Sequence, residues 1–392
     1  MPYAPYGQKI TMDQPGTEKK GEKPRILVAP LDWGLGHAAR CIPLIRALVD
    51  RNCEVWLAGE GAQQHLLQEA FPELPFLQLP GYRIRYAKTA GGLAWKMIRQ
   101  YPRLLRAIRK EQEWLQEKMS THAFDAVISD NRYGLCHPDA TCVFITHQLL
   151  IKSWLGRWTE SLMQKKNYRY ISRFNACWVP DEEGPANLAG ELSHPGKKPQ
   201  VPVRYIGWLS RCKKLDLPEK KGHILVVLSG PEPQRSLLEE KVIQGISHYA
   251  GTATVVRGLP GSAGLIPSTN MIRFVNHLPA RELNAEMQQA EWVISRSGYS
   301  TIMDLVSVGK RSVLVPTPGQ TEQEYLAVYL AGKGIAATLS QKDFTLEAAL
   351  DKARTCNYTL PEAADNSLLK KGVEELLQSI AQKRQAAQTN LG

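Results

Sequence analysis

The sequence predicts an α/β protein made of two domains, each built on a parallel β-sheet. The chain has 392 residues, a length that suits two domains. Short runs rich in Val, Ile and Leu alternate with longer stretches of helical spacing, which is typical of a parallel sheet covered on both faces. The polar segment 210–222 interrupts this pattern once, and the pattern then begins again. The second half is therefore expected to repeat the architecture of the first.

The predicted parts follow in order along the chain. Residues 1–24 are rich in Pro, Gly and Lys and predict a disordered tail, 25–209 a first domain, 210–222 a linker, 223–360 a second domain, and 361–392 a helix with a tail. Strands of the first domain are expected at Arg25–Ala29, Cys53–Ala58, Phe76–Leu79, Asp125–Ser129, Cys142–Thr146, Cys177–Val179 and Val203–Ile206. Strands of the second are expected at His223–Leu228, Ala253–Arg257, Met271–Val275, Trp292–Ser295, Ser312–Pro316 and Ala336–Leu339, and the last helix at Asn366–Arg384.

The composition excludes several classes of protein. With 43% apolar and 22% charged residues the chain is too apolar for disorder, and its Gly and Pro follow no period. Seven cysteines without a C-x-x-C pair favour free thiols in a reducing compartment over disulfides or a zinc site. The polar N-terminus and the lack of a run of about 18 apolar residues predict neither a signal peptide nor a membrane span. We therefore expect a cytoplasmic protein.

The first predicted strand leads into a glycine loop that contains a histidine, Gly34-Leu-Gly36-His37, and then into a helix. Free N–H groups at such a helix start can hold an anion or a polar oxygen. Gly34, Gly36 and Ala39 also match the dinucleotide fingerprint G-x-G-x-x-G/A. Near a helix N-terminus the pKa of His37 is expected to be lowered, which favours the neutral, basic form. The alternative is a loop histidine that only caps the turn.

Two further polar residues are predicted at the same edge of the sheet. Asp130 follows the strand Asp125–Ser129 and could fix the tautomer of His37, as the orienting carboxylate does in a general-base pair. The alternative for Asp130 is a turn or a helix cap. His147 follows the next strand and either lines an acceptor pocket or is a loop histidine whose hydrogen bonds are satisfied.

In the second half, a strand ends in the loop Arg296-Ser297-Gly298 and a helix follows. Ser297 and Gly298 offer N–H groups and a hydroxyl that suit a pyrophosphate. Asp304 lies two turns into that helix and could accept hydrogen bonds from ribose hydroxyls.

The next strand repeats the arrangement with the loop Pro316–Gly319, after which Gln323 and Glu324 open a helix and could reach sugar hydroxyls. A helix start that needs a cap explains one such loop easily. It explains two successive loops with these residue types less well.

These motifs resemble the donor-binding half of GT-B glycosyltransferases, most closely family 28, which includes the lipid-linked peptidoglycan N-acetylglucosaminyltransferase and plant galactolipid synthases. The family pattern is a strand, Arg-Ser-Gly, a Thr, an acidic residue, and then a strand with Pro and a Gln pair. The residues that match it here are Arg296, Ser297, Gly298, Thr301, Asp304, Pro316 and Gln323. The pairing of His37 with Asp130 is similar to the His–Asp dyad of related plant and antibiotic glycosyltransferases.

The resemblance implies a GT-B fold, with two Rossmann-like domains, a cleft between them and a C-terminal crossing helix. It implies transfer of a sugar, with inversion, from a nucleotide sugar to an acceptor hydroxyl. The expected nucleotide sugar is a uridine diphosphate sugar. His37 would be the base and Asp130 its partner. The donor would be held by Gly36, Gly230, Ser297, Gly298, Thr301, Asp304, Gln323 and Glu324. Because helix-start N–H groups would hold the diphosphate, no metal or other cofactor is predicted.

Three positions depart from the family pattern. Asp304 is shorter than the usual Glu, and Glu324 replaces the second Gln. The loop Leu228–Pro233 replaces a Gly-rich donor loop, and its prolines lack N–H donors.

The positive charge is concentrated in the first half. The whole chain has a net charge of +11, and residues 25–214 contribute 27 basic and 17 acidic groups. Residues 82–110 hold nine basic residues and no acidic one, among them Arg99, Arg103 and Arg106, and residues 151–173 form a second basic block with tryptophans. Cations beside apolar side chains predict contact with an anionic membrane surface, each cation adding about 1 kcal/mol. The resemblance to family 28 implies a lipid-linked acceptor on this side. A solvated helix that packs on its own sheet is the alternative, and no nucleic-acid module is present.

Other functions stay open at this point. The loop with Gly34, Gly36 and Ala39 also fits an NAD(P)-dependent oxidoreductase, although the second nucleotide-type half is then unexplained. A catalytically silent sugar-nucleotide-binding protein and a two-domain sugar-nucleotide epimerase are further alternatives.

Overall fold

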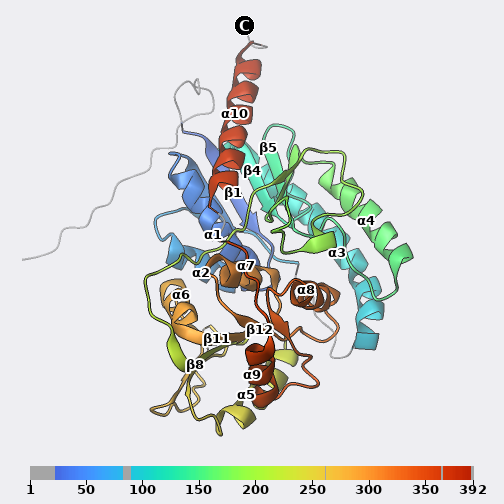
Figure 1. Ribbon diagram of the computed structural model, residues 1–392. Helices are drawn as coiled ribbons and strands as arrows, with labels where there is room; N and C mark the ends of the chain where they lie inside the picture. Colours follow the sequence, from blue (N-terminus) through green and yellow to red (C-terminus); the bar gives the residue numbers. More distant parts are fainter. Residues whose placement is uncertain (1–22, 83–89, 261, 363–364, 390–392) are drawn as a thin grey trace, which may run out of the picture.

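The computed structural model describes residues 23–82, 90–260, 262–362 and 365–389. They form two α/β domains, each a parallel sheet flanked by helices (Figure 1). The first sheet contains β1 (Arg25–Pro30), β2 (Glu54–Gly59), β3 (Phe76–Gln78), β4 (Ala126–Asp130), β5 (Thr141–Ile145), β6 (Ala176–Val179) and β7 (Val203–Tyr205). The second contains β8 (Lys220–Val227), β9 (Thr252–Val256), β10 (Ile272–Val275), β11 (Ala290–Ser295), β12 (Ser312–Leu314) and β13 (Ala337–Thr338).

The helices of the first domain connect its strands. They are α1 (Leu35–Val49), α2 (Ala62–Ala70), α3 (Ala90–His122), α4 (Arg157–Ile171) and the 3-10 turn η1 (Gly190–Leu192). The helices of the second domain are α5 (Gln234–Ile246), α6 (Ala280–Gln289), α7 (Tyr299–Ser307), α8 (Thr321–Gly332) and α9 (Leu346–Thr355), and α10 (Ser367–Thr389) follows. The predicted tail at residues 1–24 lies outside the described residues up to position 22.

Each predicted strand overlaps an observed one, so the predicted α/β architecture is confirmed. The strand orders are β3-β2-β1-β4-β5-β6-β7 and β10-β9-β8-β11-β12-β13. The direction in which strands are added to the sheet reverses between β1 and β4 in the first sheet and between β8 and β11 in the second. Ligands of such sheets bind at the carboxyl ends of the strands at this switch point. The main difference is at β8, which begins inside the predicted linker because Lys220 pairs with Ala290 of β11.

Alternate residues of β1 explain why both faces of the first sheet are covered. Ile26 and Val28 belong to a core shared with α1 and α10, whereas Leu27 and Ala29 pack on the opposite face with residues of α3. Because successive side chains of a strand point to opposite faces, a run of apolar residues needs helices on both sides.

The helix α10 crosses back from the second domain to the first, as the resemblance implied (Figure 1). Its buried side chains are Leu369, Val373, Leu376 and Ile380. Farther along, the Arg384 guanidinium donates to both carboxylate oxygens of Asp125 at 2.8 and 2.6 Å. The first domain is therefore completed by the last helix of the chain.

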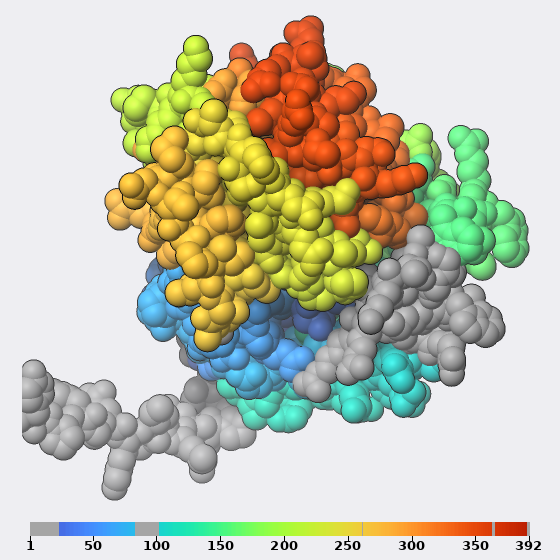
Figure 2. Space-filling view, turned by 90° about the horizontal axis from the view of Figure 1, so that it is seen from below, coloured from blue at the N-terminus to red at the C-terminus, as the bar shows by residue number. Residues whose placement is uncertain are grey.

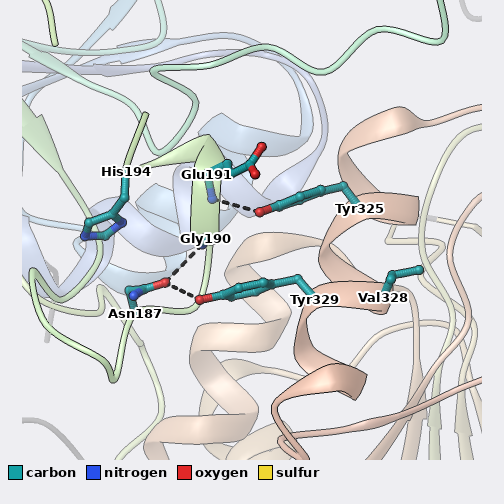
Figure 3. Close-up of a pocket in the computed structure, with 7 residues that line it drawn as sticks. All are labelled: Asn187, Gly190, Glu191, His194, Tyr325, Val328 and Tyr329. Atoms are coloured by element: carbon teal, nitrogen blue, oxygen red, sulfur yellow. Dashed lines mark hydrogen bonds between the residues drawn. The ribbon is translucent and has the colours of Figure 1, made fainter. Parts of the chain in front are cut away.

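The two domains touch along α7 and α8. Ser300 Oγ donates to the carbonyl of Gly36 at 2.8 Å. Farther along α8, the N–H of Glu191 donates to Tyr325 Oη at 2.7 Å, and Tyr329 Oη donates to Asn187 Oδ1 at 2.6 Å (Figure 3). These contacts bring the carboxyl edges of the two sheets together.

Candidate active site

A cluster of polar side chains lies at the carboxyl edge of the first sheet. His37 is in the first turn of α1, Asp130 ends β4, and His147 follows β5. His37 Nδ1 is 3.0 Å from Asp130 Oδ1, and the Asp130 side chain is fully buried. The structure thus brings together the two residues that the sequence suggested as a base and its partner.

Arg40 connects the members of this cluster, although no sequence motif indicated it. It lies one helical turn after His37, and its Nε donates to Asp130 Oδ2 at 2.7 Å while Nη2 donates to Asp130 Oδ1. The same Nη2 is 2.9 Å from His37 Nδ1, and Nη1 is 3.1 Å from His147 Nδ1. The three-residue spacing of His37 and Arg40 on a predicted helix was the available signal, because such residues share a face.

The protonation states of the pair follow from these contacts. Burial lowers the pKa of His37 below its ordinary value, Asp130 opposes this, and Arg40 adds to the lowering. Burial alone would raise the pKa of Asp130, but Arg40 and His37 outweigh it and hold that pKa well below its usual range. The lowered pKa of His37 was predicted, whereas the main cause is burial rather than the helix N-terminus. The site therefore holds a neutral imidazole beside an ionised carboxylate, which is what a general-base pair requires.

The second domain reaches this cluster through Glu322, in the first turn of α8. His147 Nε2 is 2.8 Å from Glu322 Oε1, and the side-chain amide of Gln148 donates to Oε2. The His147 ring is stacked on Tyr299 of α7, with centroids 4.2 Å apart. The prediction of an acceptor-lining His147 needs correction: the ring is buried between the domains, where both of its nitrogens have partners.

The start of α7 carries the first predicted donor loop. Ser297 Oγ donates to the carbonyl of Gln323 at 2.8 Å, which joins this loop to the start of α8. A Cβ placed on Gly298 would meet no atom within 4 Å. Within the described residues no side chain caps α7, and Thr301 on its first turn is half-buried. Such a helix start can receive an anion.

Beside Gly230, two buried polar atoms have no partner. A Cβ on Gly230 would lie 3.4 Å from Thr317 Oγ1 and 4.0 Å from Arg296 Nε. In the described part of the chain neither atom makes a hydrogen bond. Arg296 is anchored by its other nitrogens, which donate to the carbonyls of Val315 and Gln234. Burial lowers the pKa of Arg296 only to about 10, so this buried residue is a cation at neutral pH. An unpartnered guanidinium N–H and an unpartnered hydroxyl beside a glycine loop suit an oxyanion.

The remaining predicted donor residues bind the protein itself. Asp304 is buried and accepts from Ser210 Oγ at 2.8 Å and from Arg211 Nε at 3.2 Å. Its carboxylate therefore holds the linker, which corrects the expectation of an acid open to ribose hydroxyls. Gln323 Oε1 accepts from the N–H of Thr317 at 2.9 Å, and Glu324 accepts from the N–H of Gly319 at 2.9 Å. These two side chains shape the loop before α8.

The predicted basic surface divides into two parts. In the first, residues 83–89 and the side chain of Arg99 lie outside the described residues, whereas Arg103 and Arg106 are exposed on α3. Of the apolar residues described there, Ile108 is buried and Leu104 half-buried, whereas Leu105 is 39% exposed. In the second part, at α4 and the loop before it, the apolar side chains point outward: Trp154 is 60% and Trp158 79% exposed.

Figure 2 shows this segment projecting from the side of the molecule. Among the described residues no helix is long and apolar enough to cross a membrane, and no group of acidic, His and Cys side chains could hold a metal ion.

Comparison with known proteins shows which family the second domain resembles. Residues 274–382 match the glycosyltransferase family 28 C-terminal domain. The second domain thus resembles the C-terminal domain of that family. The solved glycotransferase of kitacinnamycin covers 94% of this chain and 98% of its own with a TM-score of 0.59 at 15% identity. The GT-B fold and the resemblance to family 28 are thereby confirmed.

Proteins of similar sequence are also named as glycosyltransferases. An N-acetylglucosamine transferase of Rhodopseudomonas palustris, named for UDP-N-acetylglucosamine and for N-acetylmuramyl-(pentapeptide) pyrophosphoryl-undecaprenol, is 40% identical over 81 residues. That alignment covers 20% of this chain and only 21% of the relative. The transferase of the same name from Synechocystis is 21% identical over 334 residues, which is 82% of this chain and 85% of the relative. The similarity is therefore high over a short stretch and low over the whole length.

Proposed function

We propose that the chain transfers a sugar from a nucleotide sugar to the hydroxyl of a lipid-linked acceptor, with inversion at the anomeric carbon. The observation that supports this most is the pair of His37 and Asp130 at the domain interface, with a neutral imidazole beside an ionised carboxylate. In one step, His37 Nε2 would take the proton of the acceptor hydroxyl while its oxygen bonds to the anomeric carbon. The bond to the diphosphate oxygen would break, and the diphosphate would leave with the electron pair.

The donor would lie across the loops of the second domain. The open N-terminus of α7 and the unpartnered Arg296 Nε and Thr317 Oγ1 beside Gly230 offer donors for two phosphate groups. Their positive potential would stabilise the leaving diphosphate without a metal or other cofactor. The relatives named for UDP-N-acetylglucosamine support a uridine diphosphate sugar as the first donor to test.

The acceptor would reach His37 from a membrane surface. The loop that leaves the site at His147 reaches the exposed Trp154 seven residues later, and its Lys152 carbonyl accepts from Thr321 of α8. The helix that follows, α4, carries the exposed Lys165, Lys166 and Arg169. Exposed tryptophans among cations suit the interface of an anionic bilayer. The relatives named for an undecaprenol-linked acceptor support this assignment, which would place the protein peripherally on the cytoplasmic face.

A ligand screen followed by a transfer assay tests the proposal. A uridine diphosphate sugar at about 100 times its Kd should stabilise the protein by about 2.7 kcal/mol in thermal unfolding. Undecaprenyl-linked acceptor and donor should then yield a product of inverted anomeric configuration by NMR. If the protein binds the donor but neither transfers its sugar nor hydrolyses it, a catalytically silent binding protein is favoured. Tight binding of reduced nicotinamide dinucleotide in place of nucleotide sugars would favour an oxidoreductase.

A further inference from the structure

The contact between His147 and Glu322 fixes the tautomer of a histidine next to the proposed base. An arginine side chain only donates, so His147 Nδ1, 3.1 Å from Arg40 Nη1, must be the accepting nitrogen. Its proton is then on Nε2, which donates to Glu322 Oε1 at 2.8 Å. Glu322 belongs to the second domain and the other residues to the first. The tautomer of His147 is therefore set across the domain interface.

Arg40 links this tautomer to the base. Its Nη2 donates to Asp130 Oδ1 and lies 2.9 Å from His37 Nδ1, which is itself 3.0 Å from Asp130 Oδ1. This nitrogen of His37 therefore has both a donor and an acceptor within reach, so proximity to Arg40 alone does not fix its tautomer. A proton on Nδ1 that is donated to Asp130 leaves Nε2 of His37 free to accept the proton of a substrate. A bare Nδ1 that accepts from Arg40 would instead put the proton on Nε2 and block the base. The position of the guanidinium relative to Asp130 and His37 therefore decides between an active and an inactive tautomer of His37.

Glu322 is also tied to the proposed donor loops. The next residue, Gln323, accepts from the N–H of Thr317 through its side chain and from Ser297 Oγ through its carbonyl. A displacement of these loops by a bound donor would move the start of α8 and Glu322 with it. The charged groups around His37 are then Asp130 and Arg40 from the first domain and Glu322 from the second, with His147 between them.

Resting on the proposed function, we propose that Glu322 is a positioning residue. By holding His147 in the tautomer that accepts from Arg40, it couples the position of the donor loops to the base-competent tautomer of His37.

The experiment compares Glu322→Ala and Glu322→Gln with Tyr329→Phe. Tyr329 is a matched control because its hydroxyl also crosses from α8 to the first domain, at 2.6 Å from Asn187, without touching His147. In protein labelled with 15N-histidine, the His147 ring is assigned with a His147→Gln variant. Wild type should show His147 with the proton on Nε2, and Glu322→Ala should show a mixture of tautomers and a lower titration midpoint for His37. The midpoint falls because removal of a nearby anion disfavours the imidazolium.

In the transfer assay, Glu322→Ala should lower kcat at least tenfold, leave the Kd for UDP unchanged and shift the acidic limb of the kcat/KM profile to lower pH. Glu322→Gln should restore most of kcat, because an amide oxygen still accepts from Nε2 of His147. Tyr329→Phe should change neither the acidic limb of the kcat/KM profile nor the tautomer of His147. A wild-type His147 with the proton on Nδ1, or Glu322→Ala spectra and profiles equal to those of Tyr329→Phe, would overturn the proposal. The NMR measurement needs no substrate, so absence of transfer in wild type would refute the proposed function alone.

Discussion

The Arg40 guanidinium donates to both oxygens of the Asp130 carboxylate, and the two side chains are 2% and 0% exposed. Removal of one partner leaves the other charge buried without compensation, which costs about 3–5 kcal/mol. Arg40→Met should therefore lower the free energy of unfolding by about that amount in urea denaturation. Arg51, which pairs with Glu374 at the surface, is the control, and Arg51→Met should cost less than about 1 kcal/mol. An equal loss in the free energy of unfolding for Arg40→Met and Arg51→Met would contradict the claim that burial makes the first pair more costly to break.

The same pair predicts a specific acid sensitivity. The pKa of Asp130 in the folded chain lies below its value of about 3.9 in an unfolded one. Its contribution to stability is thus complete above that value and is lost as the pH falls toward the folded pKa. The free energy of unfolding of wild type should decline more steeply below about pH 4 than that of Asp130→Asn. Urea denaturation of both proteins at several pH values between about pH 5 and pH 3 checks this. An equal decline of the free energy of unfolding with pH in the two proteins would rule it out.

His37→Ala tests the base directly. Loss of a general base lowers turnover by about two to four orders of magnitude, while the Kd for UDP should stay within error by calorimetry. Because the pKa of His37 lies below its ordinary value, wild-type kcat/KM should already be level at neutral pH. His65→Ala removes an exposed histidine of α2 and should be neutral. Full turnover in His37→Ala would leave only donor electrostatics and proximity as sources of catalysis.

Thr317→Val tests the phosphate contact beside Gly230. The variant keeps the shape of the side chain but removes the unpartnered hydroxyl. It should weaken UDP binding by about 1.5–3 kcal/mol, the range for a hydrogen bond to a charged group, and leave uridine binding unchanged, because only UDP carries the phosphates. Calorimetric titration measures both, and Thr355→Val, at an exposed threonine of α9, is the control. An equal loss for uridine would move the hydroxyl away from the diphosphate.

Flotation with anionic vesicles tests the membrane surface. The protein should float at about 0.1 M salt and be largely released at about 1 M, where the Debye length falls from about 10 to about 3 Å. Trp158→Ser, at a tryptophan that is 79% exposed, should reduce flotation, and reversal of Arg103 and Arg106 to Glu should reduce it further. Trp178→Ser is unsuitable as a control because that residue is buried, whereas Leu265→Ser removes an exposed apolar residue of the other domain. Absence of the wild-type protein from the floating fraction at low salt would favour a soluble acceptor.

The strands were predictable because both faces of the sheets are buried, and runs such as Ile26–Ala29 then contain only apolar residues. The pairing of His37 with Asp130 was predictable for a related reason: β1 and β4 are neighbours that end at one edge, where His37 follows β1 and Asp130 is the last residue of β4. Topology alone thus brought these two residues together.

Contacts that join distant segments could not be predicted in this way. Asp304 occupies the position of a nucleotide ligand in the family pattern, yet Arg211 from the linker pairs with it in the folded chain. Glu322 and His147 are 175 positions apart and meet only after both domains have folded and docked. Outward-facing tryptophans before and in α4 likewise carry no signal in hydropathy, because the same residues could equally have packed on the sheet.

The crossing of α10 has a consequence for the order in which the protein can be made. The apolar residues of the first domain that contact Leu369 and Val373 are synthesised long before these two partners leave the ribosome. During translation the first domain must therefore persist with part of its core uncovered while the second domain folds. A chain cut before Ser367 should then damage the domain that is farthest from the cut in sequence, and early nascent chains should need shielding from aggregation.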